Sequence, residues 1–341
     1  MAAEIAEQPA VVADLVRRGA EIAAAVDGVR PPALRGFVLV ARGSSDHAAL
    51  YGRYLLEHAA GVPVALAAPS LHTRYGVVPD LDGCLAVGVS QSGRTPEVAA
   101  TMEVLRAGGA RTVAICNDVT SPLAEVSEVV VPLGAGEERA VPATKTFTAQ
   151  IAAFALVAQA LARPDWAPLR WSPALDALAA VVADDTDARA AAADLVDAHR
   201  FVQVGRSFLY PVAVEAGLKI SETTGLVATG YSPHDLLHGP IAVANPRVHA
   251  LCFSSPGPVA DDVAAAAAAL AGRGARIVAI AERPGDVAVA DVVVGVPAGA
   301  GELLAPLVYI VRAQQLALHL ALGRGVDPDR PFGLTKVTQT V

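Results

Sequence analysis

Hydroxyl and amide side chains follow directly on an apolar run in the segment Ser90-Gln91-Ser92-Gly93-Arg94-Thr95. Pro96 comes next and suits the first turn of a helix. A strand-to-helix turn in a parallel sheet lies at the carboxyl edge of the sheet, where the free N–H groups of the helix start attract an oxyanion. The hydroxyls of Ser90, Ser92 and Thr95 would add three donors. The segment therefore predicts a phosphate site.

Two other interpretations of this segment explain less of it. A helix N-cap needs one hydroxyl, whereas this turn also contains two further hydroxyls, an amide and a glycine. A hydrolase nucleophile elbow has the pattern Gly-x-Ser-x-Gly, and residues 88–91 fit it until Ser92 stands where the second glycine is needed. A phosphate-binding turn accounts for all of these residue types.

Lys219 and Glu222 lie three positions apart in a segment with a helical pattern, 211–222. They therefore share one helix face, which suits a base and a cation that act on one substrate. A surface ion pair of low energetic value has the same spacing. The two residues by themselves leave both interpretations open.

His238 lies in an apolar segment that ends in Gly239 and Pro240, where a histidine is more often structural than catalytic. His234 precedes it by four positions, so a two-histidine metal site has to be considered. Zinc needs further ligands, and Asp235 is the carboxylate at suitable spacing. We expect no metal here.

Apolar runs of strand length alternate with helical patterns along the chain. In the first half, buried strands are predicted at 36–41, 62–66, 84–89, 112–116 and 129–133, with helices at 48–60 and 96–107. This alternation indicates a parallel sheet that is covered on both faces. The hydroxyl-rich segment is then placed at the carboxyl edge of the sheet.

The second half of the chain repeats the first at a nearly constant offset. Residues 36–40 match 200–204, and 84–90 match 248–254, each 164 positions later. Such a repeat is stronger evidence for duplication than any single motif. We predict an α/β fold of two tandem doubly wound parallel-sheet domains, each five-stranded and flavodoxin-like, with a helical linker and a C-terminal tail.

The repeat and the proline-marked breaks divide the chain into five segments. They are an N-terminal helical segment (1–30), a first domain (31–163), a helical linker (164–193), a second domain (194–322) and a C-terminal tail (323–341). The linker is expected to contain a helix at 173–193. The tail contains one lysine, Lys336, and is expected to lie over the active site.

The composition excludes several classes of protein. Hydrophobic residues make up 53% and charged residues 18% of the chain, which is typical of globular proteins and not of disordered ones. The net charge of −8, without a basic block, argues against a nucleic-acid partner. No uninterrupted apolar run reaches the roughly 18 residues of a membrane span, and the N-terminus lacks a signal pattern. We expect a cytoplasmic protein with no membrane partner.

The motifs together resemble the sugar isomerase (SIS) family, in its branch with two SIS domains. The hydroxyl-rich segment resembles the phosphate signature of that family. Residues 41–47 resemble the family's Gly-Ser loop, and residues 141–146 resemble its substrate loop. Residues 217–222 resemble its catalytic helix, and residues 237–240 resemble its histidine loop. The chain resembles the isomerase half of glutamine-fructose-6-phosphate aminotransferases, and its tail is more similar still to stand-alone SIS-type glucosamine-6-phosphate deaminases.

The resemblance implies a role for each matched residue. Glu222, beside Lys219, would move a proton between C1 and C2 of the open sugar, and His238 would open the ring. Lys336 matches a tail lysine that condenses with the sugar carbonyl in the aminotransferase. The sugar phosphate would be held by Ser45, Ser90, Gln91, Ser92 and Thr95, and other parts of the sugar by Val141, Ala143 and Thr335. The family pattern further implies no cofactor, and a homodimer in which His238 reaches the neighbour's site.

The implied reaction converts glucosamine 6-phosphate to fructose 6-phosphate and ammonia. Thr229 stands where many relatives have glutamate, and Ala143 stands where the aminotransferase has serine. These departures leave room for a fructosamine-phosphate deglycase, an ammonia-using aminotransferase-like enzyme, or a non-catalytic sugar-phosphate sensor. The first cysteine is Cys84, within a predicted strand, so we expect no glutamine-hydrolysing cysteine nucleophile in this sequence.

Overall fold

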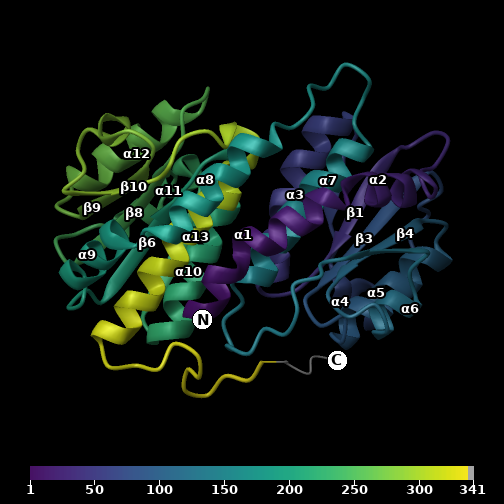
Figure 1. Ribbon diagram of the computed structural model, residues 1–341, viewed down its shortest axis with the longest axis horizontal. Helices are drawn as coiled ribbons and strands as arrows, with labels where there is room; N and C mark the ends of the chain where they lie inside the picture. The colour runs from purple at the N-terminus through teal and green to yellow at the C-terminus, as the bar shows by residue number, and fades with distance from the viewer. Residues whose placement is uncertain (337–341) are drawn as a thin grey trace. The chain divides into compact units, whose positions relative to one another are not determined.

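The structure is a computed structural model that describes residues 1–336 and consists of two compact units (Figure 1). The first-sheet unit contains Ala10–Glu138 and Lys145–Leu169, together with Thr335 and Lys336 of the tail. The second-sheet unit contains Met1–Pro9, Arg139–Thr144 and Arg170–Leu334. Each unit is therefore assembled from segments that are far apart in the sequence. The last five residues of the predicted tail lie outside the described residues.

Five parallel strands form the sheet of the first-sheet unit, in the order β2-β1-β3-β4-β5. They are β1 (Gly36–Val40), β2 (Val64–Leu66), β3 (Cys84–Ser90), β4 (Arg111–Cys116) and β5 (Val129–Pro132). Alternate strand residues face opposite sides, and the inner strands β1, β3 and β4 are buried on both sides. This burial explains why the strands are continuous apolar runs in the sequence.

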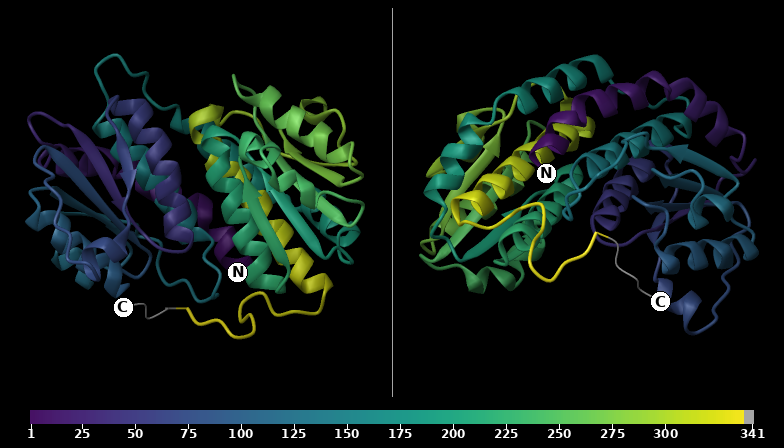
Figure 2. Two further views of the ribbon diagram at one scale, coloured as in Figure 1. Left: turned by 180° about the vertical axis from the view of Figure 1, so that it is seen from behind. Right: turned by 60° about the horizontal axis from the view of Figure 1, so that its bottom comes forward.

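Helices cover both faces of this sheet (Figure 2). On one side, α5 (Pro96–Ala107) and α6 (Pro122–Glu125) pack on Val40, Ala86 and Ala114, and α4 (Pro69–Thr73) lies against α5. The other helices of the unit are α2 (Gly19–Asp27), α3 (Ser44–Ala60) and α7 (Lys145–Ala160). The helices α3 and α7 pack closely at Gly52, where a Cβ atom would lie 2.4 Å from the ring of Phe154.

The second-sheet unit repeats this topology, with five parallel strands in the order β10-β9-β8-β6-β7. They are β6 (Arg200–Val204), β7 (Val227–Tyr231), β8 (Val248–Ser254), β9 (Arg276–Ala281) and β10 (Val292–Gly295). Within each unit the first strand lies between the second and the third. The prediction of two doubly wound five-stranded domains is confirmed.

The helices of the second-sheet unit also lie in two layers. One layer contains α8 (Trp171–Ala183), α9 (Thr186–Asp194), α10 (Tyr210–Thr224) and α13 (Gly301–Gly323). The other contains α11 (Pro233–Leu237) and α12 (Ala260–Ala271). Three short 3₁₀ turns, η1 (Ser207–Leu209), η2 (Pro240–Val243) and η3 (Pro284–Val287), connect these elements, and α1 (Ala2–Arg17) precedes both sheets in the sequence.

Helix α13 is long and apolar enough by composition to cross a membrane, but 89% of its most apolar window is buried inside the structure. Such burial is typical of a core helix that packs on its neighbours. The cytoplasmic location expected from the sequence stays a prediction.

Two sequence predictions differ from the structure in detail. The predicted helix at 173–193 is interrupted between α8 and α9, where the Asp184 carboxylate accepts a hydrogen bond from the backbone N–H of Thr186 at 2.9 Å. This side chain competes with the helix for a backbone donor. Ser44 and Ser45, predicted in a loop, instead form the first turn of α3.

Candidate active site

The candidate phosphate site lies at the carboxyl edge of the first sheet, where the connections from two neighbouring strands diverge. Strand β1 pairs with β3, but the chain goes on from β1 to the strand on one side and from β3 to the strand on the other. Helices α3 and α5 begin after these two strands. Such a switch point is where open α/β sheets bind ligands. Two helix starts with free N–H groups are thus present at this edge.

The turn between β3 and α5 is organised by its own hydroxyls. The Oγ of Ser90 lies 3.2 Å from Oγ1 of Thr95 and accepts a hydrogen bond from the backbone N–H of Gly93 at 3.1 Å. The backbone N–H of Arg94 donates to Oγ of Ser92 at 3.2 Å. Thr95 is the N-cap residue of α5, but its side chain makes no capping hydrogen bond. The structure therefore brings Ser90, Ser92 and Thr95 together, and it gives the N-capping interpretation no support at Thr95.

Arg94 in this turn and Arg42 after β1 are each paired with a carboxylate. Arg42 contacts Glu97 at 2.9 Å, and Arg94 contacts Asp118 at 2.7 Å. Hydrogen bonds from Thr120, with a smaller contribution from Arg94, hold the pKa of Asp118 below its usual range. Because these charges are balanced locally, an anion at the turn would be held chiefly by N–H and O–H donors.

Gln91 lies within the turn, and Ser45 lies in the first turn of α3. The buried Oγ of Ser45, in the first turn of α3, accepts a hydrogen bond from Nε2 of Gln150 at 2.9 Å. The backbone oxygen of Gln91 accepts from the backbone N–H of Asn117 at 3.0 Å, which leaves the half-buried Gln91 side chain outside that bond. Gln150, on α7, was not found from the sequence because it lies 105 positions from Ser45.

Gly93 is required by the geometry of this turn. Its φ is +66°, and a Cβ atom would lie 1.9 Å from Oγ of Ser121. Gly76 has a φ of +67°, but no atom lies within 4 Å of its Cβ position. The two glycines therefore share the same backbone strain on substitution and differ in steric contact.

We expect Gly93→Ala to weaken sugar-phosphate binding by at least about ten-fold, because the turn must move away from Ser121. Gly76→Ala should lose only the stability that corresponds to its strained φ, about 1–2 kcal/mol. Calorimetric titration of both variants with glucose 6-phosphate measures the difference. Equal affinities in the two variants would contradict this account of the turn.

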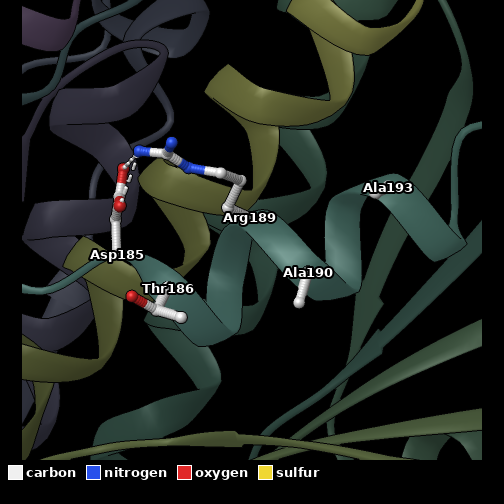
Figure 3. Close-up of a pocket in the computed structure, with 5 residues that line it drawn as sticks. All are labelled: Asp185, Thr186, Arg189, Ala190 and Ala193. Carbon is white, nitrogen blue, oxygen red and sulfur yellow. Dashed lines mark hydrogen bonds and ion pairs between the residues drawn. The ribbon is translucent and has the colours of Figure 1, made fainter.

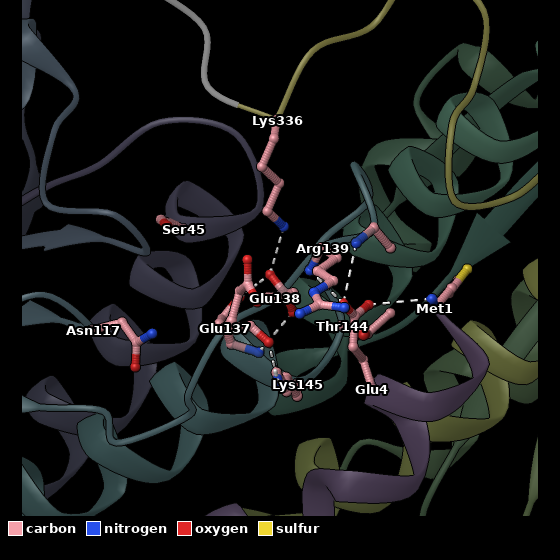
Figure 4. A network of polar contacts seen from close by, with 12 residues as sticks. Met1, Glu4, Ser45, Asn117, Glu137, Glu138, Arg139, Thr144, Lys145 and Lys336 are labelled. Carbon is pink, nitrogen blue, oxygen red and sulfur yellow. Dashed lines mark hydrogen bonds and ion pairs between the residues drawn. The ribbon is translucent and has the colours of Figure 1, made fainter.

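The tail lysine meets a carboxylate that the sequence analysis missed. Nζ of Lys336 donates to Oε2 of Glu138 at 2.7 Å, and the two side chains point at each other (Figure 4). The Glu138 side chain is fully buried and also accepts hydrogen bonds from the backbone N–H and Oγ1 of Thr146, at 3.1 and 2.7 Å. Thr335, the residue before Lys336, is exposed. Glu138 lies 198 positions from Lys336, so no local pattern links them.

On helix α10, Lys219 lies between two carboxylates. Its Nζ is 2.5 Å from Glu222 and 3.2 Å from Glu215, and the side chains of Lys219 and Glu215 are fully buried. Burial lowers the pKa of Lys219, but the charges of Glu215 and Glu222 raise it by more, so the pKa lies above its usual value. The surface-pair interpretation is therefore wrong for Lys219. Glu215 could have been found from its i, i+4 spacing to Lys219.

His234 and His238, which lie in α11 and at its C-terminal end, have different surroundings. His238, the C-cap of α11, is exposed, and among the described residues its ring has no hydrogen-bond partner. His234 lies 3.6 Å from Asp262, which also pairs with Arg206 at 3.2 Å. His234 is thus directed to an acid on α12.

The predicted substrate loop is held by residues from both ends of the chain. The backbone N–H of Val141 donates to the backbone oxygen of Asp329 at 3.0 Å, and Ala140 donates to Glu4 at 3.1 Å. Val141 and Ala143 are half-buried. Their predicted contact with a sugar stays a prediction.

A further pocket, of about 480 Å³, lies on α9 at the surface of the second-sheet unit (Figure 3). Its lining is Asp185, Thr186, Arg189, Ala190 and Ala193. Asp185 and Arg189 pair with each other at 2.9 Å, and Asp185 also meets His319 at 2.7 Å. None of the predicted site residues lines this pocket.

Comparisons with a protein-family profile, with curated sequences and with solved structures all point to SIS-domain proteins. The sequence profile of the SIS domain matches residues 35–160 and 194–324. The glutamine–fructose-6-phosphate aminotransferase (isomerizing) of Methanothermobacter thermautotrophicus is 32% identical over 98% of this chain and 56% of its own length. The chain thus spans little more than half the length of such curated relatives.

Two solved structures are similar over nearly their whole length. The C-terminal domain of glucosamine-fructose-6-phosphate aminotransferase from Francisella tularensis has a TM-score of 0.86 at 25% identity, over 96% of this chain and 97% of that one. A protein of Silicibacter pomeroyi, whose name provisionally assigns it to the phosphosugar isomerases, has a TM-score of 0.83 at 31% identity. The alignment covers 96% of this chain and 99% of that one.

Proposed function

The chain belongs to the SIS domain family, and on that premise we propose that it is an amino-sugar-phosphate isomerase and deaminase. The proposed reaction converts glucosamine 6-phosphate to fructose 6-phosphate and ammonia. The names of its relatives support an amino-sugar phosphate as the substrate class. The turn from Ser90 to Thr95 would hold the phosphate group.

The main support for this proposal is the charged group Glu215–Lys219–Glu222 on α10. The buried Lys219 is held as a cation between Glu215 and Glu222, and Glu222 keeps 22% of its side chain exposed. A partly exposed carboxylate beside a fixed cation is suited to taking a proton from carbon, because the cation stabilises negative charge that develops on the substrate. A protein that merely binds sugar phosphates does not need such a group.

The proposed steps follow from these residues. His238 transfers the proton that opens the sugar ring, which gives an aldehyde at C1 and leaves the amino group on C2. Glu222 takes the proton from C2 and delivers it to C1, while a second proton moves from the nitrogen on C2 to the oxygen on C1. C1 thereby becomes an alcohol and the C2–N bond becomes an imine. Hydrolysis of this imine then releases ammonia and leaves the C2 ketone of fructose 6-phosphate.

The test is the release of ammonia and the formation of fructose 6-phosphate from glucosamine 6-phosphate by the purified chain. Both products in equal amounts would support the proposal. A fructosamine phosphate offered in parallel tests the deglycase alternative. No turnover of either compound, with sugar phosphate still raising the melting temperature, would contradict the proposal and favour a sensor.

We further propose that the enzyme is a homodimer in which His238 serves the partner's site. In the described part of the chain, the exposed His238 ring forms no hydrogen bond or ion pair with Lys219 or Glu222, which supports this arrangement. Mixing the inactive variants Glu222→Gln and His238→Gln should restore about a quarter of the activity per site. Random pairing makes about half of the dimers mixed, and each mixed dimer has one intact site out of two. No recovery after co-refolding would contradict the shared site.

A further inference from the structure

Glu138 is a buried carboxylate that lies directly before the loop Arg139–Thr144. We propose that Glu138 positions Lys336 and takes a proton from its amino group, so that the amine can attack the sugar. This inference rests on the proposed function. It adds to that function a residue that neither the sequence motifs nor the matched loops had indicated.

The contact lies within one compact unit. Lys336 and Glu138 both belong to the first-sheet unit, and their charged atoms are 2.7 Å apart. The Glu138 side chain has no exposed surface, whereas 24% of the Lys336 side chain is exposed. The carboxylate is therefore the fixed member of the pair, and the lysine retains access to a ligand.

Glu138 is fixed by α7. The backbone N–H and the hydroxyl of Thr146 donate to its two oxygens, at 3.1 and 2.7 Å. Thr146 lies in the first turn of α7, where unpaired N–H groups and the helix dipole favour a negative charge. The neighbouring Lys145 donates to the backbone oxygen of Glu137 at 2.7 Å. The helix start thus presents an oriented carboxylate to Lys336.

A protonated lysine has no free electron pair on its nitrogen, so it must lose a proton before it can act as a nucleophile. Glu138 Oε2 is close enough to accept that proton. The neutral amine then attacks C2 of the sugar imine, a new C–N bond forms, and ammonia leaves with the proton that Glu138 returns. Water hydrolyses the resulting lysine imine, which restores the amine and releases fructose 6-phosphate.

The experiment traps this imine with borohydride and compares Glu138→Gln with Glu137→Gln. Glutamine keeps the shape of the side chain but cannot accept the proton. Glu137 is the matched control because it is the adjacent residue, its side chain is exposed and its backbone oxygen is unchanged by the substitution. Mass spectrometry of the peptide that contains Lys336 measures the reduced adduct after incubation with glucosamine 6-phosphate.

We expect the wild type and Glu137→Gln to be labelled equally at Lys336. In Glu138→Gln the label should fall by at least about ten-fold and kcat by about 100-fold, with KM changed by less than about three-fold. A purely structural role of Glu138 would not separate kcat from KM in this way. Should Glu138→Gln fail to fold, Glu138→Asp tests the same point, because it keeps the charge but withdraws it from Lys336.

If the folded Glu138 variant is labelled at Lys336 as strongly as the wild type and has the same kcat, the inference is overturned but the proposed function stands. Ammonia release by the wild type without any label at Lys336 would overturn it as well. If the wild type releases no ammonia from glucosamine 6-phosphate, the proposed function itself fails. The two failures are therefore distinguishable in one set of measurements.

Discussion

Replacement of Glu222 by glutamine is expected to lower the release of ammonia from glucosamine 6-phosphate by a factor of about 1,000 or more. Glutamine has nearly the same shape as glutamate, but it cannot take a proton from C2. The side chain lies at the partly exposed end of the Glu215–Lys219–Glu222 group, so the substitution is not expected to disturb the core. Steady-state measurement of ammonia and fructose 6-phosphate checks the expectation.

Binding of the phosphate group should survive in the same variant, since the Ser90–Thr95 turn belongs to the other unit. The shift of melting temperature with glucose 6-phosphate should therefore match that of the wild type. Glu103→Gln, an exposed glutamate on α5, controls for the loss of one carboxylate. Turnover by Glu222→Gln at the wild-type rate would remove Glu222 from the mechanism.

Replacement of Lys219 by methionine is expected to destabilise the second-sheet unit by about 3–5 kcal/mol. Methionine fills most of the space, but Glu215 is fully buried and would lose the cation that lies 3.2 Å away. An uncompensated buried carboxylate is costly because it has lost its hydration. The melting temperature and the urea midpoint of the variant measure the effect.

A second substitution separates the charge from the packing. In the double variant Lys219→Met with Glu215→Gln, no buried carboxylate at position 215 remains to be compensated, and we expect a large part of the stability to return. An equal or greater loss of stability in the double variant would show that Lys219 acts through packing. Neither variant is expected to retain full turnover, because both alter the surroundings of Glu222.

The Glu215–Lys219–Glu222 group should also affect how the stability of the protein depends on pH. The pKa of Lys219 lies above its usual value of 10.5 in the folded protein. The stability that it contributes is therefore present in full below that usual value and is lost as the pH rises through the higher folded pKa. Lys219→Met should accordingly lose stability less steeply than the wild type in the alkaline range.

Much of the fold could be predicted because its determinants are local. A parallel strand buried on both faces must be a continuous apolar run, and the runs at β3 and β8 show this directly. The turn after β3 could be predicted as well, because a strand, a cluster of hydroxyls and Pro96 occur within one short segment. The interruption between α8 and α9 was missed because Asp184 also fits a helix and acts through a side-chain hydrogen bond.

For the candidate site, the sequence by itself determined which residue types are available and which of them share a local element. The spacing of Lys219 and Glu222 on one helix face is of this kind. The burial of this pair could not be determined from the sequence, because it depends on what packs against α10. That burial decides between a surface ion pair and a fixed buried cation. The tertiary structure also decided that Ser45 meets Gln150 and that Lys336 meets Glu138, across 105 and 198 positions. Contacts at such separations arise when helices and sheets pack, and they leave no periodic signal along the chain.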